Sequence, residues 1–174
     1  MDNIQVVTLP SLKPISKDAI PRALEKAERY RMLNEPFFAE SICLDVLAAD
    51  PEHGKALAIY VLSLTDQFKT NASTGIPKAK AAIAKMKTDF DKLYYAGIVS
   101  ERRAVALLER SPAGASAAAW FHLKDAMGFY EKADAVQADQ TNDDALLRYN
   151  TCLRLISHYR LTEPPPESRD FPLE

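Results

Sequence analysis

Residues 23–51, ALEKAERYRMLNEPFFAESICLDVLAADP, predict two helices and the turn between them. Small and aromatic residues recur at three- and four-residue steps in both halves, which places them on one face of each helix. Pro36 suits the first turn of the second helix, because a backbone N–H is not needed there. Pro51 ends that helix, because a proline disfavours helical geometry in the residue before it. The stretch therefore predicts an antiparallel helix pair.

The same helical period continues along most of the chain. We predict helices at about residues 17–33, 36–49, 52–68, 77–86, 89–110, 116–137 and 143–159. The composition of residues 69–76 predicts a loop, with Pro77 as the first residue of the next helix. Ser16 is a candidate N-cap of the first helix, and Asn142 or Asp143 a candidate cap of the last. No segment alternates with the period of a strand, so we predict an all-α fold of about seven helices.

Length and composition agree with a single helical domain. The 174 residues are 47 % apolar and 26 % charged, and five glycines are few for an all-β protein. We predict an extended N-terminal arm at residues 1–16, a helical domain at residues 17–159 and a proline-rich C-terminal tail at residues 160–174. The domain is long enough to enclose a continuous core.

Residues 23–51 also follow the tetratricopeptide frame of W-x2-L-G-x2-Y, then A-x3-F, then P. The marked positions hold Ala23, Lys26, Ala27, Tyr30, Ala39, Cys43 and Pro51. Over residues 17–159 the chain resembles the tetratricopeptide-repeat family. The resemblance implies antiparallel helix pairs stacked as a short right-handed solenoid. A plain helical bundle is the alternative architecture.

Tetratricopeptide-repeat proteins hold a peptide or a helix of a partner in a concave groove lined by their first helices. The resemblance therefore implies a protein-interaction module, an adaptor or scaffold, that catalyses no reaction. The residues we predict to line the groove are Tyr94, Tyr95, Arg102, Arg148 and Thr151. Tyrosine and arginine are frequent binding hot spots. The alternative is that the tyrosines pack in the core and the arginines pair with carboxylates.

One subgroup of this family grips a C-terminal carboxylate with lysine, asparagine and arginine residues on successive first helices. The corresponding places here hold Leu24 and Ala58, and Arg148 is the only basic match. We therefore do not predict that clamp.

Three other functions fit the sequence less well. Self-assembly through the ends of a short helical array is the nearest alternative. Nucleic-acid binding is favoured by residues 69–110, which carry nine basic and four acidic groups, but residues 111–145 carry two basic and six acidic groups. The net charge of −2 also gives no overall attraction to phosphate. For an enzyme, the sequence lacks a catalytic motif, a phosphate-binding glycine loop and a metal-ligand spacing, so we predict no cofactor and no metal.

The two cysteines, Cys43 and Cys152, each lie in an apolar helical context and are predicted to be buried free thiols. No apolar run approaches the ~20 residues that span a bilayer, so we predict no membrane partner. The first five residues lack the basic and apolar regions of a secretion signal. These features predict a cytoplasmic protein with reduced thiols, whose partner is a protein or peptide or a second copy of the chain.

Overall fold

The computed structural model describes residues 10–165, and the regular structure of this part is entirely helical. A short 3-10 helix, Lys17–Ala19, leads into the first α-helix. The α-helices are α1 (Ile20–Met32), α2 (Pro36–Ala49), α3 (Gly54–Thr65), α4 (Phe68–Ile83), α5 (Asp89–Arg110), α6 (Ala115–Val136) and α7 (Asp144–His158). The predicted all-α class with about seven helices is confirmed. Among the described residues, no helix combines the length and the apolar character that crossing a bilayer requires.

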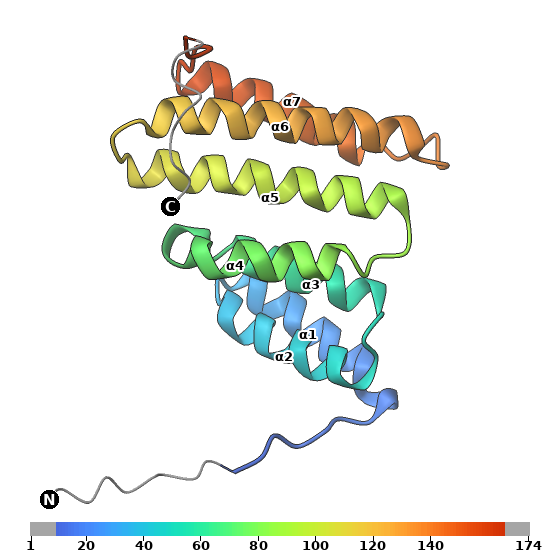
Figure 1. Ribbon diagram of the computed structural model, residues 1–174. Helices are drawn as coiled ribbons and strands as arrows, with labels where there is room; N and C mark the ends of the chain where they lie inside the picture. The colour runs from blue at the N-terminus through green and yellow to red at the C-terminus, as the bar shows by residue number, and fades with distance from the viewer. Residues whose placement is uncertain (1–9, 166–174) are drawn as a thin grey trace, which may run out of the picture.

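Each helix packs against the next one in the chain, and the most extensive contact joins α5 to α6. α1 also contacts α3, and α3 contacts α5, so that these three helices form a row. Figure 1 shows the resulting stack, with α1 to α4 on one side of α5 and with α6 and α7 on the other. α5 therefore lies in the middle of the molecule and contacts both groups of helices.

The buried core consists of two clusters that share α5. One cluster contains Leu57 and Phe68 from α3 and α4, together with Val99 of α5. The other contains Tyr130 of α6 together with Ile98 of α5. Full burial of one such side chain stabilises a fold by about 1.5–3 kcal/mol. Because adjacent residues of α5 enter different clusters, this helix ties the two halves of the core together.

The predicted bounds hold best where a local signal ends the helix. α2 and α5 have the bounds predicted from the sequence. Asn34 adopts a left-handed backbone with φ 58° between α1 and α2, a conformation that asparagine tolerates better than most residues. Ser111 ends α5 with φ 49°, and Gly114 begins α6 with φ 77°. The predicted ranges leave breaks between residues 33 and 36 and between residues 110 and 116, and both breaks are confirmed.

The loop predicted at residues 69–76 is wrong, because these residues belong to α4. Gly75 is buried, and a Cβ atom there would lie 3.0 Å from Cε1 of Phe68, so the glycine serves close packing and not a turn. The helix is kinked at Asn71 (φ −125°, ψ 29°), and Pro77 lies inside it and not at its first residue. A proline within a helix costs about 3 kcal/mol. Packing of this face against α3 and α5 therefore outweighs the local preference.

The helix caps differ in detail from the predictions. Ser16 precedes the 3-10 helix, but its side chain makes no cap hydrogen bond, and its carbonyl accepts one from the Ala19 N–H at 3.1 Å. The predicted side-chain cap is therefore wrong. Before α7, the Asp143 side chain makes no cap either. The other candidate, Asn142, accepts a hydrogen bond at its Oδ1 from the Asp144 N–H at 2.9 Å.

The two ends of the chain lie partly outside the described residues. Of the predicted arm, residues 10–16 carry no helix or strand, and residues 1–9 are not described. Of the predicted tail, residues 161–165 follow α7 without regular structure, and residues 166–174 are not described. Leu161 is only 7 % exposed and packs in the core cluster of α6 and α7. The beginning of the tail is thus part of the domain.

Candidate functional site

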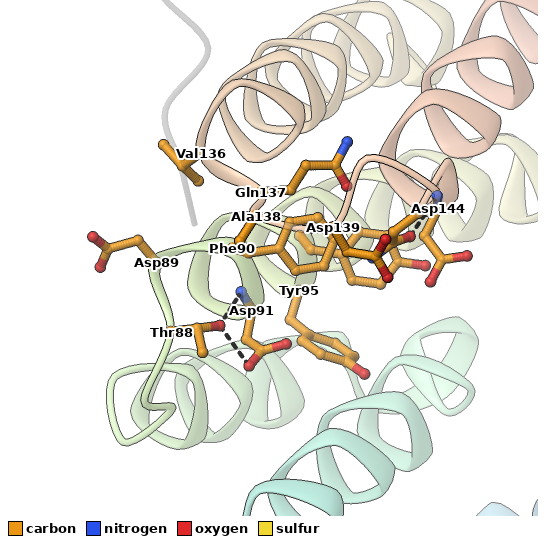
Figure 2. A pocket seen from close by; sticks show the side chains of 12 residues that line it. Thr88, Asp89, Phe90, Asp91, Tyr95, Val136, Gln137, Ala138, Asp139 and Asp144 are labelled. Carbon is orange, nitrogen blue, oxygen red and sulfur yellow. Dashed lines mark hydrogen bonds between the residues drawn. The ribbon is translucent and has the colours of Figure 1, made fainter.

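A cavity of about 620 Å³ lies where the start of α5 meets the end of α6 and the loop that leads to α7. This volume is within the usual range of ligand sites. The cavity is lined by Thr88, Asp89, Phe90, Asp91, Tyr94, Tyr95, Val136, Gln137, Ala138, Asp139, Asn142 and Asp144. Figure 2 shows Asp91 and Tyr95 on one side of it and Gln137, Asp139 and Asp144 on the other. We call this cavity the acid–aromatic pocket.

The charge of the acid–aromatic pocket is negative. Four of its lining residues are aspartates, Asp89, Asp91, Asp139 and Asp144, and none is a lysine, arginine or histidine. Hydrogen bonds from the side chain and backbone of Thr141 hold the pKa of Asp139 below its usual value. Asp89 is partly neutralised by Lys92, whose Nζ lies 3.9 Å from its Oδ1. The carboxylates of Asp91, Asp139 and Asp144 have no ion-pair partner among residues 10–165, and such a group of carboxylates attracts cations.

The start of α5 holds one of these carboxylates in place. The Thr88 Oγ1 atom accepts a hydrogen bond from the Asp91 N–H at 2.9 Å and so caps the helix. The same hydroxyl donates to Asp91 Oδ2 at 2.6 Å, and Figure 2 draws both bonds. Asp91 and Asp89 lie in the first turn of α5, where a negative charge is favoured by the helix dipole. Local helix chemistry thus accounts for the position of these two aspartates.

Aromatic rings of α5 form a second part of the lining. Phe90 and Tyr94 stack with their ring centroids 5.5 Å apart and their planes 11° from parallel. Tyr94 also meets Tyr95 edge to face, with the centroids 5.3 Å apart. Burial, the neighbouring Tyr94 and the carboxylates of Asp91 and Asp144 raise the pKa of Tyr95 to about 12, while Arg31 acts in the opposite direction. The Tyr95 hydroxyl therefore stays protonated and can donate a hydrogen bond.

A buried polar network lies next to these aromatic rings. Glu101 of α5 is only 3 % exposed. Its Oε2 accepts a hydrogen bond from the Tyr130 hydroxyl at 2.7 Å, and its Oε1 accepts one from Arg148 Nη1 at 3.0 Å. Burial alone would lower the pKa of Arg148. The negative charge of Glu101 and the interaction with Tyr94 outweigh the effect of burial, so the pKa is raised. The network joins α5, α6 and α7, and the Tyr94 ring rests against Tyr130 with centroids 6.0 Å apart.

The five predicted groove residues fall in different places. Tyr94 and Tyr95 line the acid–aromatic pocket, but both are half-buried and also pack in the core. Arg148 pairs with Glu101 behind the pocket. The Thr151 hydroxyl donates to the Leu147 carbonyl of its own helix at 2.9 Å. Arg102 lies at a separate cavity near α1 and α3.

Neither the four aspartates nor Glu101 is among the residues predicted from the sequence to line a groove. Their charges meet only in the folded chain, because Glu101 and Arg148 are 47 positions apart. A partial signal existed for Asp89 and Asp91, since acidic residues in a first helical turn follow from the predicted start of the helix. No local pattern identifies Asp139 or Asp144 as their neighbours.

The cysteines and His122 do not line the acid–aromatic pocket. Cys43 and Cys152 are buried and free, as predicted, and burial raises the pKa of each thiol to about 12. Burial, with a contribution from Arg103, lowers the pKa of His122 to about 4. Within residues 10–165, no group of three or more histidine, cysteine, aspartate or glutamate side chains is arranged to hold a metal ion.

Comparison of the chain with models of known protein families, with curated proteins and with solved structures yields no match.

Proposed function

We propose that this protein is an interaction module that binds a segment of a partner protein through a cationic side chain placed in the acid–aromatic pocket. The observation that carries the proposal is the lining of that pocket, which contains three aromatic residues, no basic residue and four aspartates, of which only Asp89 has an ion-pair partner among the described residues. A lysine or arginine side chain has the matching chemistry. Its aliphatic stem packs on the rings while its charge meets the carboxylates.

The energies of the two interactions are modest and add to each other. A cation over an aromatic ring contributes about 0.5–1 kcal/mol at an exposed site and about 2 kcal/mol when water is excluded. An exposed ion pair contributes about 0.2–1 kcal/mol. One side chain in this pocket thus gives weak binding, and a useful affinity requires further contacts along the partner segment. The same carboxylates repel phosphate, so the pocket does not favour a nucleic acid.

The arrangement of the helices supports an interaction role. α1, α3 and α5 form a row of successive contacts, which is the relation between first helices that stacked tetratricopeptide-like pairs require. We therefore propose a short solenoid, with the acid–aromatic pocket at the start of α5. The two buried free thiols support our placement of the protein in the reducing cytoplasm.

The test uses a small probe whose charge can be removed. N-acetyl-lysine amide and its uncharged analogue N-acetyl-norleucine amide are titrated into ¹⁵N-labelled protein, and amide shifts are followed by NMR. We expect saturable shifts at the start of α5 and in the α6–α7 loop with the lysine probe alone. These shifts should weaken as salt is added, because the carboxylates are exposed to screening.

A pair of adjacent aspartates provides the matched control. Asp144→Asn removes a charge that lines the pocket. Asp143→Asn removes the charge of the preceding residue, which is exposed and does not line the pocket. We expect the first variant to weaken lysine binding about two- to fivefold and the second to leave it within error. Equal effects of the two variants, or equal binding of both probes, contradict the proposal.

Self-association is the second candidate function, and exposed apolar side chains favour it. At the turn between α1 and α2, Met32 is 81 % exposed, Leu33 62 % and Phe37 65 %. Phe38 is 50 % exposed as well. The helices α1 and α2 lie at one end of the helical stack (Figure 1). Sedimentation equilibrium should show a mass that rises with concentration and that Phe37→Glu returns to the monomer value. A monomer at all concentrations excludes this function.

A further inference from the structure

A second cavity, of about 530 Å³, lies among α1, α3 and α5 and has a different charge pattern. It is lined by Arg31, Asn34, Thr65, Asp66, Lys69, Arg102, Val105, Ala106 and Glu109. Three of these residues are basic and two are acidic. We call this cavity the arginine pocket, because its properties depend on Arg102.

Pairing inside the arginine pocket leaves one cation uncompensated. Arg31 is neutralised by Asp66, whose Oδ2 accepts from both Nε and Nη2 of Arg31 at 2.8 Å. Lys69 lies 4.0 Å from Glu109, and both side chains are largely exposed. Among residues 10–165, Arg102 has neither an ion-pair partner nor a hydrogen-bond acceptor, and its Nε atom is buried. A buried donor of this kind needs an acceptor, and residues 10–165 do not provide one, so the acceptor is water or a ligand group.

The two pockets lie along one face of α5. Tyr95 and Arg102 are seven positions apart, which is about two helical turns and about 10 Å along the axis. The intervening rotation brings both side chains to nearly the same side of the helix. Arg31 of the arginine pocket is also close enough to Tyr95 to affect its ionisation. A single extended segment can therefore reach both pockets.

We propose that the arginine pocket binds the side-chain carboxylate of an aspartate or glutamate in the same partner segment whose cationic side chain enters the acid–aromatic pocket. This inference rests on the proposed function. A planar carboxylate matches the fork of a guanidinium group. A phosphate, with about twice the charge, meets more repulsion from Asp66 and Glu109.

The distance between the pockets sets the spacing of the two partner residues. A segment in the polyproline II conformation advances about 3.1 Å per residue and brings every third side chain to the same face, so about 10 Å corresponds to about three residues. The motif is thus a lysine or arginine separated from an acidic residue by about two others. The site differs from the C-terminal carboxylate clamp, whose expected places here are Leu24 and Ala58, and both lie outside the arginine pocket.

The experiment is a selection from a random library of short peptides displayed with both ends joined to the carrier, so that no free terminal carboxylate is present. We expect enriched peptides to carry a basic and an acidic residue at about this spacing. A representative peptide is then synthesised with blocked ends, together with versions in which the acidic residue is an amide or the basic residue is norleucine. Binding is measured by calorimetry.

Arg102→Gln should weaken binding of the parent peptide about five- to tenfold. The same variant should change binding of the amide version by no more than about twofold. Arg103→Gln is the matched control, because Arg103 lines a different cavity between α4 and α6. Asp144→Asn should instead act through the basic residue of the peptide. Thermal unfolding of each variant establishes that it is folded.

The outcomes separate this inference from the proposed function. Enriched peptides that are basic but carry no acidic residue, or equal loss with Arg102→Gln and Arg103→Gln, overturn the arginine pocket and leave the acid–aromatic pocket standing. Enriched peptides that share no basic residue overturn the proposed function itself. A selection without any enriched sequence counts against both.

Discussion

Replacement of Gly97 by alanine should destabilise the protein, because there is no space for a side chain at this position. Gly97 lies on α5 where the helix meets the Tyr130 ring of α6. A Cβ atom at Gly97 would lie 2.5, 2.8 and 2.9 Å from three carbon atoms of that ring. Carbon atoms at van der Waals contact are about 3.5–4.0 Å apart. Either the ring or the helix must therefore move.

The expected magnitude follows from two opposing effects. Extra atoms in a packed core cost about 1–3 kcal/mol. The upper end applies here, because Tyr130 is fully buried and its hydroxyl is bonded to Glu101. In the opposite direction, alanine stabilises a helix by about 0.8–1 kcal/mol relative to glycine, because its helix propensity is higher. The net loss should be about 2 kcal/mol, or about 4–8 °C in the melting temperature for a chain of this size.

Urea denaturation followed by circular dichroism measures this change, and Gly128→Ala is the matched control. Gly128 lies inside α6, and a Cβ atom there would have nothing within 4 Å. This variant should become more stable by about 0.5–1 kcal/mol, because only helix propensity changes. If both variants shift stability in the same direction by similar amounts, the close approach of α5 to Tyr130 is refuted.

Three further predictions concern buried groups. Tyr130→Phe removes one hydrogen bond to the buried Glu101 and should lower the free energy of unfolding by about 1–3 kcal/mol. Urea denaturation measures this change, and an unchanged free energy of unfolding contradicts the prediction. Burial raises the pKa of both Cys43 and Cys152 to about 12. At pH 8 the two thiols should therefore react with a thiol reagent only as fast as the protein unfolds. Rapid labelling of the native protein contradicts this prediction. His122 has its pKa lowered to about 4, mainly by burial, so the unfolded chain binds the extra proton between about pH 4 and its ordinary value of 6.5. Stability should therefore fall as the pH is lowered through this window, and His122→Gln should flatten the fall. Parallel pH profiles of the two proteins contradict it.

The sequence predicted the helices well where the deciding interactions are local. The bounds of α2 and α5 follow from apolar spacing together with the break residues Asn34, Pro36 and Ser111. The failure at residues 69–76 has the opposite cause, because these residues favour a loop by themselves and are helical only through packing on α3 and α5. Composition cannot reveal that Gly75 is placed against a phenylalanine ring.

The candidate site was predictable only in part. Tyr94 and Tyr95 were named from residue type, and they do line a cavity, but their role in binding stays a prediction. Arg102 and Arg148 were named for the same reason, yet one has no partner among the described residues and the other is paired with Glu101. Residue type does not distinguish these two states, since the difference lies in which carboxylate is nearby.

The sequence by itself thus determined the all-α class, most helix ends and the burial of both cysteines, because each depends on the periodicity and the backbone preferences of neighbouring residues. Only the tertiary structure decided which charges meet. It gathered Asp91 and Asp144 around three aromatic rings, buried Glu101 against Arg148 and left Arg102 unpaired. Electrostatic and packing energies depend on distances in space, and those distances join residues from different helices.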